Sequence, residues 1–112
     1  MEEVKVLGTE NGVLTIALSG DIDLGNAENF YTETLNAYQA APSDITFDCK
    51  ELNFIDSTTL GTFVKILKTL KANGHTMRLI NLQAKIKKLF LMCSLEGFLL
   101  MVVTLLWQDL IK

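Results

Sequence analysis

The chain is poor in the residue types that most catalytic and metal sites require. Its 112 residues include two cysteines, one histidine and one proline. Cys49 and Cys93 lack the spacing of a zinc site or a redox pair, and both stand within apolar patterns. We therefore expect buried thiols in a protein of the cytoplasm, rather than a disulfide framework or a metal centre.

The sequence also lacks a long hydrophobic run and an excess of basic charge. Its longest apolar run, residues 98–107, is about half of what a membrane-spanning helix needs, which predicts no membrane insertion. The net charge of −3 and the isoelectric point near 5.0 argue against direct nucleic-acid binding. With 49% hydrophobic and 21% charged residues, the chain is typical of a globular protein, and its length fits one domain over residues 1–112.

The spacing of the apolar residues predicts alternating strands and helices in an α/β fold. The first two strands are joined by Asn11-Gly12, a pair typical of hairpin turns. The later strands are separated by helices and should therefore lie parallel. The predicted strands span residues 4–7, 13–18, 44–49, 77–80 and 98–103, and the predicted helices span Asn26 to Gln39, Leu60 to Leu70, Ile86 to Cys93 and, as a final turn or short helix, Leu105 to Ile111.

A hydroxyl-rich turn, Asp56-Ser57-Thr58-Thr59, leads from an apolar strand straight into the second of these helices. The first turn of a helix carries unpaired N–H groups and a partial positive charge, so a phosphate on Ser57 would meet donors already aimed at it. Asp and Ser are also preferred N-cap residues, and capping alone would explain the pair. The turn therefore indicates either a phosphoryl acceptor or a helix cap.

Further carboxylates follow the neighbouring strand. Asp21 and Asp23 come after the second strand, and Asp56-Ser57 comes after the third. Because functional groups of open α/β sheets gather beyond the carboxyl ends of the strands, we expect these segments to share one edge of the sheet. Asp also favours turns through local hydrogen bonds, which leaves a purely structural role open.

Enzymatic functions have less support in the sequence. Ser57 lacks G-x-S-x-G surroundings, and His75 follows the far end of the helix that Ser57 begins, so we expect an exposed turn histidine and no Ser-His relay. A phosphotransfer domain with Mg²⁺ on clustered carboxylates is an alternative. The hairpin at the start and the lack of a glycine-rich phosphate loop argue against it. We predict no catalytic activity, no metal and no other cofactor.

Two segments carry a resemblance to a known family. Gly20-Asp21-Ile22-Asp23 precedes Asn26-Ala27 and Phe30, and Phe54-Ile55-Asp56-Ser57-Thr58 precedes Leu60-Gly61. They resemble the G-x-[IL]-D and D-S-[ST]-G-L-G elements of STAS domains, in particular the small stand-alone anti-sigma factor antagonists of bacteria. The resemblance spans nearly the whole chain. It implies a STAS-like layered α/β domain, with a mixed β-sheet, an N-terminal hairpin and helices packed on the sheet.

The resemblance also implies partner switching controlled by phosphorylation. In that family the serine after the aspartate, here Ser57, is phosphorylated by a partner that is both anti-sigma factor and serine kinase, and removal of the phosphate by a phosphatase restores binding. By position, the residues implied for partner binding are Asp21, Asp23, Asn26, Asp56, Ser57, Thr58, Thr59 and Gly61. The alternative within the family is a STAS subunit of a membrane transport complex for lipids or anions, which binds a cytoplasmic ATPase without phosphorylation.

Two features set this chain apart from the family pattern. Thr59 stands where the family usually has Gly, and it adds a β-branched side chain where the backbone of a kinase or partner would approach. The apolar residues 98–107 either complete a satellite of the core or form a surface for a homodimer or another partner.

Overall fold

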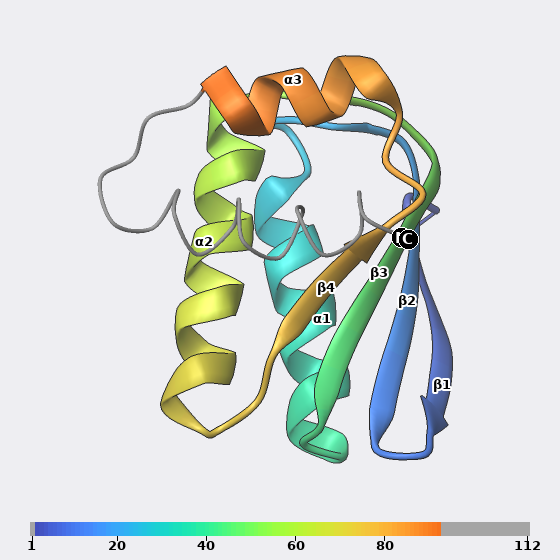
Figure 1. The fold of residues 1–112 in the computed structure, drawn as a ribbon, viewed down its shortest axis with the longest axis vertical. Helices are drawn as coiled ribbons and strands as arrows, with labels where there is room; N and C mark the ends of the chain where they lie inside the picture. Colours follow the sequence, from blue (N-terminus) through green and yellow to red (C-terminus); the bar gives the residue numbers. More distant parts are fainter. Residues whose placement is uncertain (1, 93–112) are drawn as a thin grey trace.

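A computed structural model describes residues 2–92 of the chain. Its elements follow one another in the order β-β-α-β-α-β-α (Figure 1). Strands β1 to β4 span Val4–Glu10, Val13–Ile22, Asp44–Ile55 and Met77–Ile80, and helices α1 to α3 span Ala27–Ala40, Ser57–Ala72 and Ala84–Met92. Within residues 2–92, no helix combines the length and the apolar character that crossing a membrane would take.

The sheet is mixed, as the sequence predicts. Its four strands lie in the order β1-β2-β3-β4. β1 and β2 form an antiparallel hairpin through Asn11 and Gly12, whose φ angles of 53° and 76° are the positive values that a tight hairpin turn requires. β3 pairs in parallel with both β2 and β4, because α1 and α2 return the chain to the same end of the sheet.

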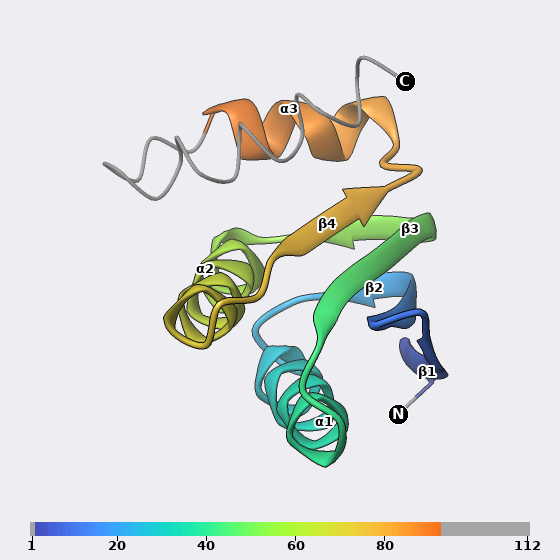
Figure 2. The same ribbon diagram turned by 60° about the horizontal axis from the view of Figure 1, so that its bottom comes forward.

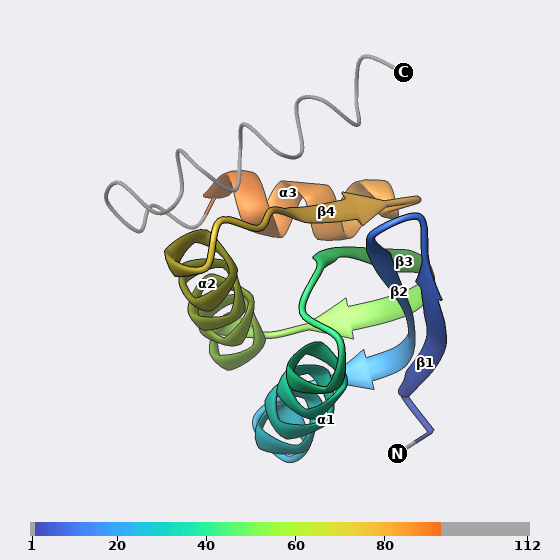
Figure 3. The same cartoon turned by 90° about the horizontal axis from the view of Figure 1, so that it is seen from below.

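The helices form a layer on the sheet. α1 and α2 lie side by side against one face, and α3 lies near β4 (Figures 2 and 3). A cluster of aromatic rings joins the layers at the centre of the core, with Phe63 of α2 in contact with each of the others at centroid distances of 5.1–5.5 Å. The other rings come from α1, β3 and α3, and they are Phe30, Phe47 and Phe90.

The predicted element types are confirmed for the described residues, but several boundaries differ. β2 continues to Ile22 and β3 to Ile55, well beyond the predicted ends, because the two strands stay paired up to these residues. Register shifts after Ala17 and Gly20 break the two-residue alternation on which the sequence prediction depended. Cys49 is buried, as predicted. Cys93, the predicted strand 98–103 and the predicted final helix lie outside the described residues.

A buried hydroxyl on α1 offers a test of the packing. Thr34 is fully buried, and within residues 2–92 its hydroxyl has no hydrogen-bond partner. Thr34→Val should raise the free energy of unfolding by about 1 kcal/mol, because a methyl group of similar shape replaces an unpaired polar group. The matched control is Thr62→Val on α2, which removes a buried hydroxyl that donates to the Thr58 carbonyl at 3.0 Å and should not stabilise. Denaturant melts decide, and equal effects of the two substitutions would contradict the expectation.

Candidate functional site

The turn between β3 and α2 forms the first part of the candidate site. Asp56 is the N-cap of α2, with an extended backbone and a carboxylate oxygen, Oδ1, that accepts a hydrogen bond from the Thr59 backbone N–H at 3.0 Å. Ser57 and Thr58 follow as the first helical residues, and both are exposed. The cap is therefore supplied by Asp56, and Ser57 stands exposed at the positively polarised end of the helix.

The loop between β2 and α1, residues 23–26, forms the second part. It follows Ile22, which pairs directly with Ile55 at the end of β3. The backbone N–H of Leu24 donates to Oδ2 of Asp56 at 2.9 Å. The two segments therefore meet at one edge of the sheet, as the parallel strands predict. We call this end of the molecule, formed by residues 23–26 and 56–59, the Ser57 pole; it lies at the top of Figure 1, where β2 and β3 end.

The Asp56 carboxylate is stabilised in its ionised form. Desolvation by burial works against ionisation, but the N–H groups of Thr59, Leu24 and Thr58 and the Thr59 hydroxyl donate hydrogen bonds that outweigh it. The pKa of Asp56 is therefore lower than that of an ordinary aspartate. Asp56 is therefore ionised at neutral pH, and its negative charge lies directly beside Ser57.

The lowered pKa of Asp56 makes part of the stability depend on pH. Asp56→Asn should lower the free energy of unfolding by about 1 kcal/mol at neutral pH, because an amide has one acceptor oxygen where the carboxylate has two. The folded-state pKa is depressed, so the carboxylate stabilises the fold above the unfolded pKa of about 3.9, and this stabilisation is lost as the pH falls through the folded value. Denaturant melts between pH 7 and pH 2 should show the difference between wild type and variant shrinking on acidification. A difference that does not change with pH would rule out this role of the charge.

The other residues implied for partner binding lie at or beside the Ser57 pole. Asp21 is exposed at the end of β2. Asp23 and Asn26 are half-buried and shape the loop, since Asp23 accepts from the Gly25 N–H at 2.9 Å and Asn26 accepts from the Asp23 N–H at 2.8 Å. Gly61 is half-buried on α2, with open space where a Cβ would stand.

Thr59 also belongs to the Ser57 pole, but its side chain is fully buried. Its hydroxyl donates to the carbonyl oxygen of Ile22 at 2.5 Å. The prediction that this side chain meets an approaching kinase is therefore wrong. The reason is helical geometry, since Thr59, Phe63, Ile66 and Leu70 recur at three- and four-residue spacing and share the buried face of α2. The same spacing is visible in the sequence and would have predicted the burial.

Two exposed apolar side chains near the pole were missed by the sequence analysis. Leu24 is 75% exposed in the loop beside Asp56, and Phe54 is 48% exposed near the end of β3, where it pairs with Asp21. Both side chains present apolar surface to solvent at or near the Ser57 pole. For Leu24 the available signal was an apolar residue inside an acidic turn, where no periodic pattern places it in the core.

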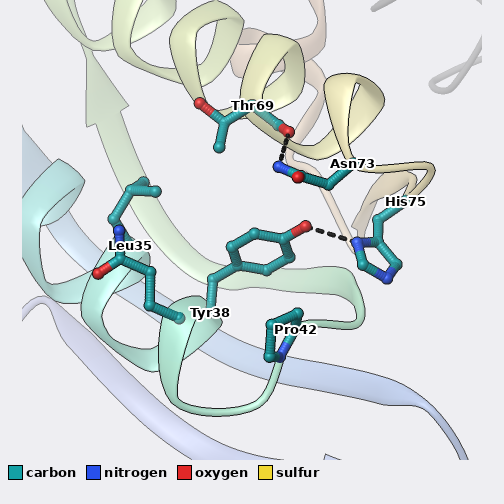
Figure 4. Close-up of a pocket in the computed structure, with 7 residues that line it drawn as sticks. Leu35, Tyr38, Pro42, Thr69, Asn73 and His75 are labelled. Carbon is teal, nitrogen blue, oxygen red and sulfur yellow. Dashed lines mark hydrogen bonds between the residues drawn. The ribbon is translucent and has the colours of Figure 1, made fainter.

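A pocket of about 360 Å³ lies at the opposite end of α1 and α2 from the Ser57 pole (Figure 4). The Tyr38 hydroxyl and the Nδ1 atom of His75 form a hydrogen bond in it. His75 is thus half-buried against Tyr38, and the prediction of an exposed turn residue is wrong. α2 has 16 residues and is about 24 Å long, so His75 lies far from Ser57 and the two cannot form a catalytic pair.

Comparisons with known proteins agree with this fold. The family model described as STAS domain matches residues 5–106. The anti-sigma-B factor antagonist of Bacillus subtilis (strain 168) is 29% identical over 96 residues, which cover 86% of each chain. The anti-sigma factor antagonist SpoIIAA in its unphosphorylated form is similar in structure, with a TM-score of 0.67, 22% identity, and coverage of 80% of this chain and 83% of that one.

Two further solved structures share the fold. The phosphorylated form of the Bacillus protein SpoIIAA gives a TM-score of 0.66 at 22% identity, covering 82% of this chain and 84% of that one. The murine anion transporter Slc26a9 gives a TM-score of 0.59 at 16% identity, covering 76% of this chain and 16% of that chain. Since the family match extends over most of the sequence, the chain belongs to the STAS domain family.

Proposed function

We propose that this protein is an anti-sigma factor antagonist whose binding to its partner is switched by phosphorylation of Ser57. The observation that carries the proposal is the exposed Ser57 at the first position of α2, next to a cap that Asp56 supplies without it. The similarity to the Bacillus subtilis antagonist over 86% of both chains supports the same function.

The switch is electrostatic in this proposal. A phosphoryl group on Ser57 adds about −1.5 to −2 charges. The group would lie beside Asp56, which is ionised, and close to the loop that contains Asp23. A partner surface that accommodates the neutral serine would then have to bury a concentrated negative charge without a matching cation, which lowers its affinity.

The partners follow from the proposed switch. One is an anti-sigma factor that is also the serine kinase for Ser57, and another is a phosphoserine phosphatase that reverses the modification. We place these encounters in the cytoplasm and assign the chain no catalytic step of its own. The proposal includes no metal, and within residues 2–92 no group of three or more His, Cys, Asp or Glu side chains is arranged to hold one. A homodimer is a further proposal.

A second candidate is the STAS subunit of a membrane transport complex. It is favoured by one observation, the fold shared with the anion transporter Slc26a9. In that case the domain would bind a cytoplasmic ATPase, and Ser57 would need no phosphate. The two candidates therefore differ in the partner that they require and in the chemical state of Ser57.

Copurification from the native cell separates the two candidates. We expect a tagged chain to retain a serine kinase that also binds a sigma factor, and mass spectrometry to find phosphate on Ser57 in part of the material. Adding ATP to the purified complex should release the kinase as Ser57 becomes modified. Recovery of a membrane transporter with its ATPase, and a Ser57 that is never phosphorylated, would favour the second candidate.

A further inference from the structure

The buried hydroxyl of Thr59 connects the end of β2 with the cap of α2. Thr59 Oγ1 lies 2.5 Å from the Ile22 carbonyl oxygen at the end of β2 and 3.0 Å from Asp56 Oδ1 at the start of α2. A threonine hydroxyl has a single proton, so the two acceptors share it. The Thr59 backbone N–H also donates to the same Asp56 oxygen, at 3.0 Å. The end of β2 and the cap of α2 are thereby tied to one side chain.

The Asp56 carboxylate extends this connection to the neighbouring loop. Its Oδ1 atom is held by Thr59, and its Oδ2 atom accepts from the Leu24 backbone N–H at 2.9 Å. The position of Leu24 therefore depends on Asp56, and the position of Asp56 depends on Thr59. The Thr59 side chain is 0% exposed, so its hydroxyl donates from the interior of the protein.

Phosphorylation of Ser57 would introduce a competitor for the hydrogen bonds that hold Asp56. A phosphoryl group on Ser57 accepts hydrogen bonds strongly and would lie within reach of the first-turn N–H groups of α2, which are the donors that Asp56 now uses. With only backbone donors on Oδ1, Asp56 would compete directly with the phosphate for them. The Thr59 hydroxyl gives Asp56 a further donor that faces the interior, away from exposed Ser57.

We propose that Thr59 is a positioning residue. Its hydroxyl holds Asp56, and through Asp56 the loop of residues 23–26, at the cap of α2, also when Ser57 carries a phosphoryl group. This inference rests on the proposed phosphorylation of Ser57. When Ser57 is phosphorylated, the Ser57 pole changes its charge but keeps its shape, and Leu24 is presented to a partner in the same place in both states.

The test follows hydrogen exchange at the Leu24 amide. Wild type, Thr59→Val and Thr59→Ser are each prepared with serine and with biosynthetically installed phosphoserine at position 57, so no kinase is required. In wild type we expect phosphorylation to change the exchange rate of Leu24 by less than about threefold. In Thr59→Val, which keeps the shape and removes the hydroxyl, we expect phosphorylation to accelerate it by about tenfold or more, and Thr59→Ser should behave as wild type.

The controls keep the outcome unambiguous. Exchange at Ile16, which is fully buried in β2, reports whether each variant retains its core. Two results would contradict the proposed role of Thr59. One is a tenfold acceleration of exchange at Leu24 when wild type is phosphorylated, a measurement that needs no variant to fold. The other is an equal effect of phosphorylation on exchange at Leu24 in Thr59→Val and in wild type. A kinase that ignores Ser57 would refute the proposed function and leave these exchange rates unaffected, so the two failures can be told apart.

Discussion

Ser57→Ala should abolish phosphorylation of this chain by its cognate kinase and leave the anti-sigma factor bound in the presence of ATP. The expectation follows from geometry, since Ser57 is exposed at the helix start while Asp56 supplies the cap. For the same reason the free energy of unfolding should change by no more than about 0.5 kcal/mol, as for other surface substitutions. Incubation with kinase and ATP, followed by mass spectrometry, measures the phosphate, and a denaturant melt measures the stability.

The neighbouring hydroxyl provides the matched control. Thr58 is exposed at the next position of α2, and Thr58→Ala keeps Ser57, so phosphate should still be found on Ser57 in this variant. Thr59 needs no such control as an acceptor, because its hydroxyl is fully buried and engaged with Ile22 and Asp56. Phosphate on Thr58 in the Ser57→Ala protein, at the rate seen for wild type, would show that the kinase does not select Ser57.

The order of elements could be predicted because short-range signals mark each of them. Asn11-Gly12 predicted the hairpin, and both residues adopt the positive φ angles that such a turn uses. Asn73-Gly74 follows the last residue of α2, and Gly74 has the positive φ of 79° that is typical of the residue after a helix end. The long ends of β2 and β3 could not be predicted, because their polar residues belong to strands only through pairing between distant parts of the chain, Asp21 with Phe54 being one example.

The composition of the Ser57 pole was predicted better than the roles within it. The rule for parallel strands brought Asp23 and Asp56 together correctly, because it depends only on strand direction. Burial within the pole depends on how α2 is rotated against the sheet, and this rotation places Thr59 inside and Ser57 outside. The family motif compares Thr59 with Gly and carries no signal of its position on the buried face of α2, which the three- and four-residue spacing does show.

Leu24→Ala should weaken binding of the anti-sigma factor by about 5- to 30-fold, which corresponds to about 1–2 kcal/mol. Leu24 is 75% exposed, so most of its apolar surface is available for burial against a partner. Its backbone is held to Asp56 beside Ser57, which places this surface next to the phosphorylation site. Because the side chain packs little within the protein, its removal should hardly change the fold. Titration calorimetry with the purified partner measures the affinity.

The control for Leu24→Ala removes an equally large side chain from another surface. Leu7 is 53% exposed on β1, the edge strand at the far side of the sheet from β4 (Figure 1). Leu7→Ala should leave the affinity within about a factor of two, because that position is remote from Ser57 in the sheet order. If both substitutions weaken binding equally, apolar area in general drives the association. If only Leu7→Ala weakens it, the partner binds the edge of the sheet, and a charge added at Ser57 would act on the complex from a distance.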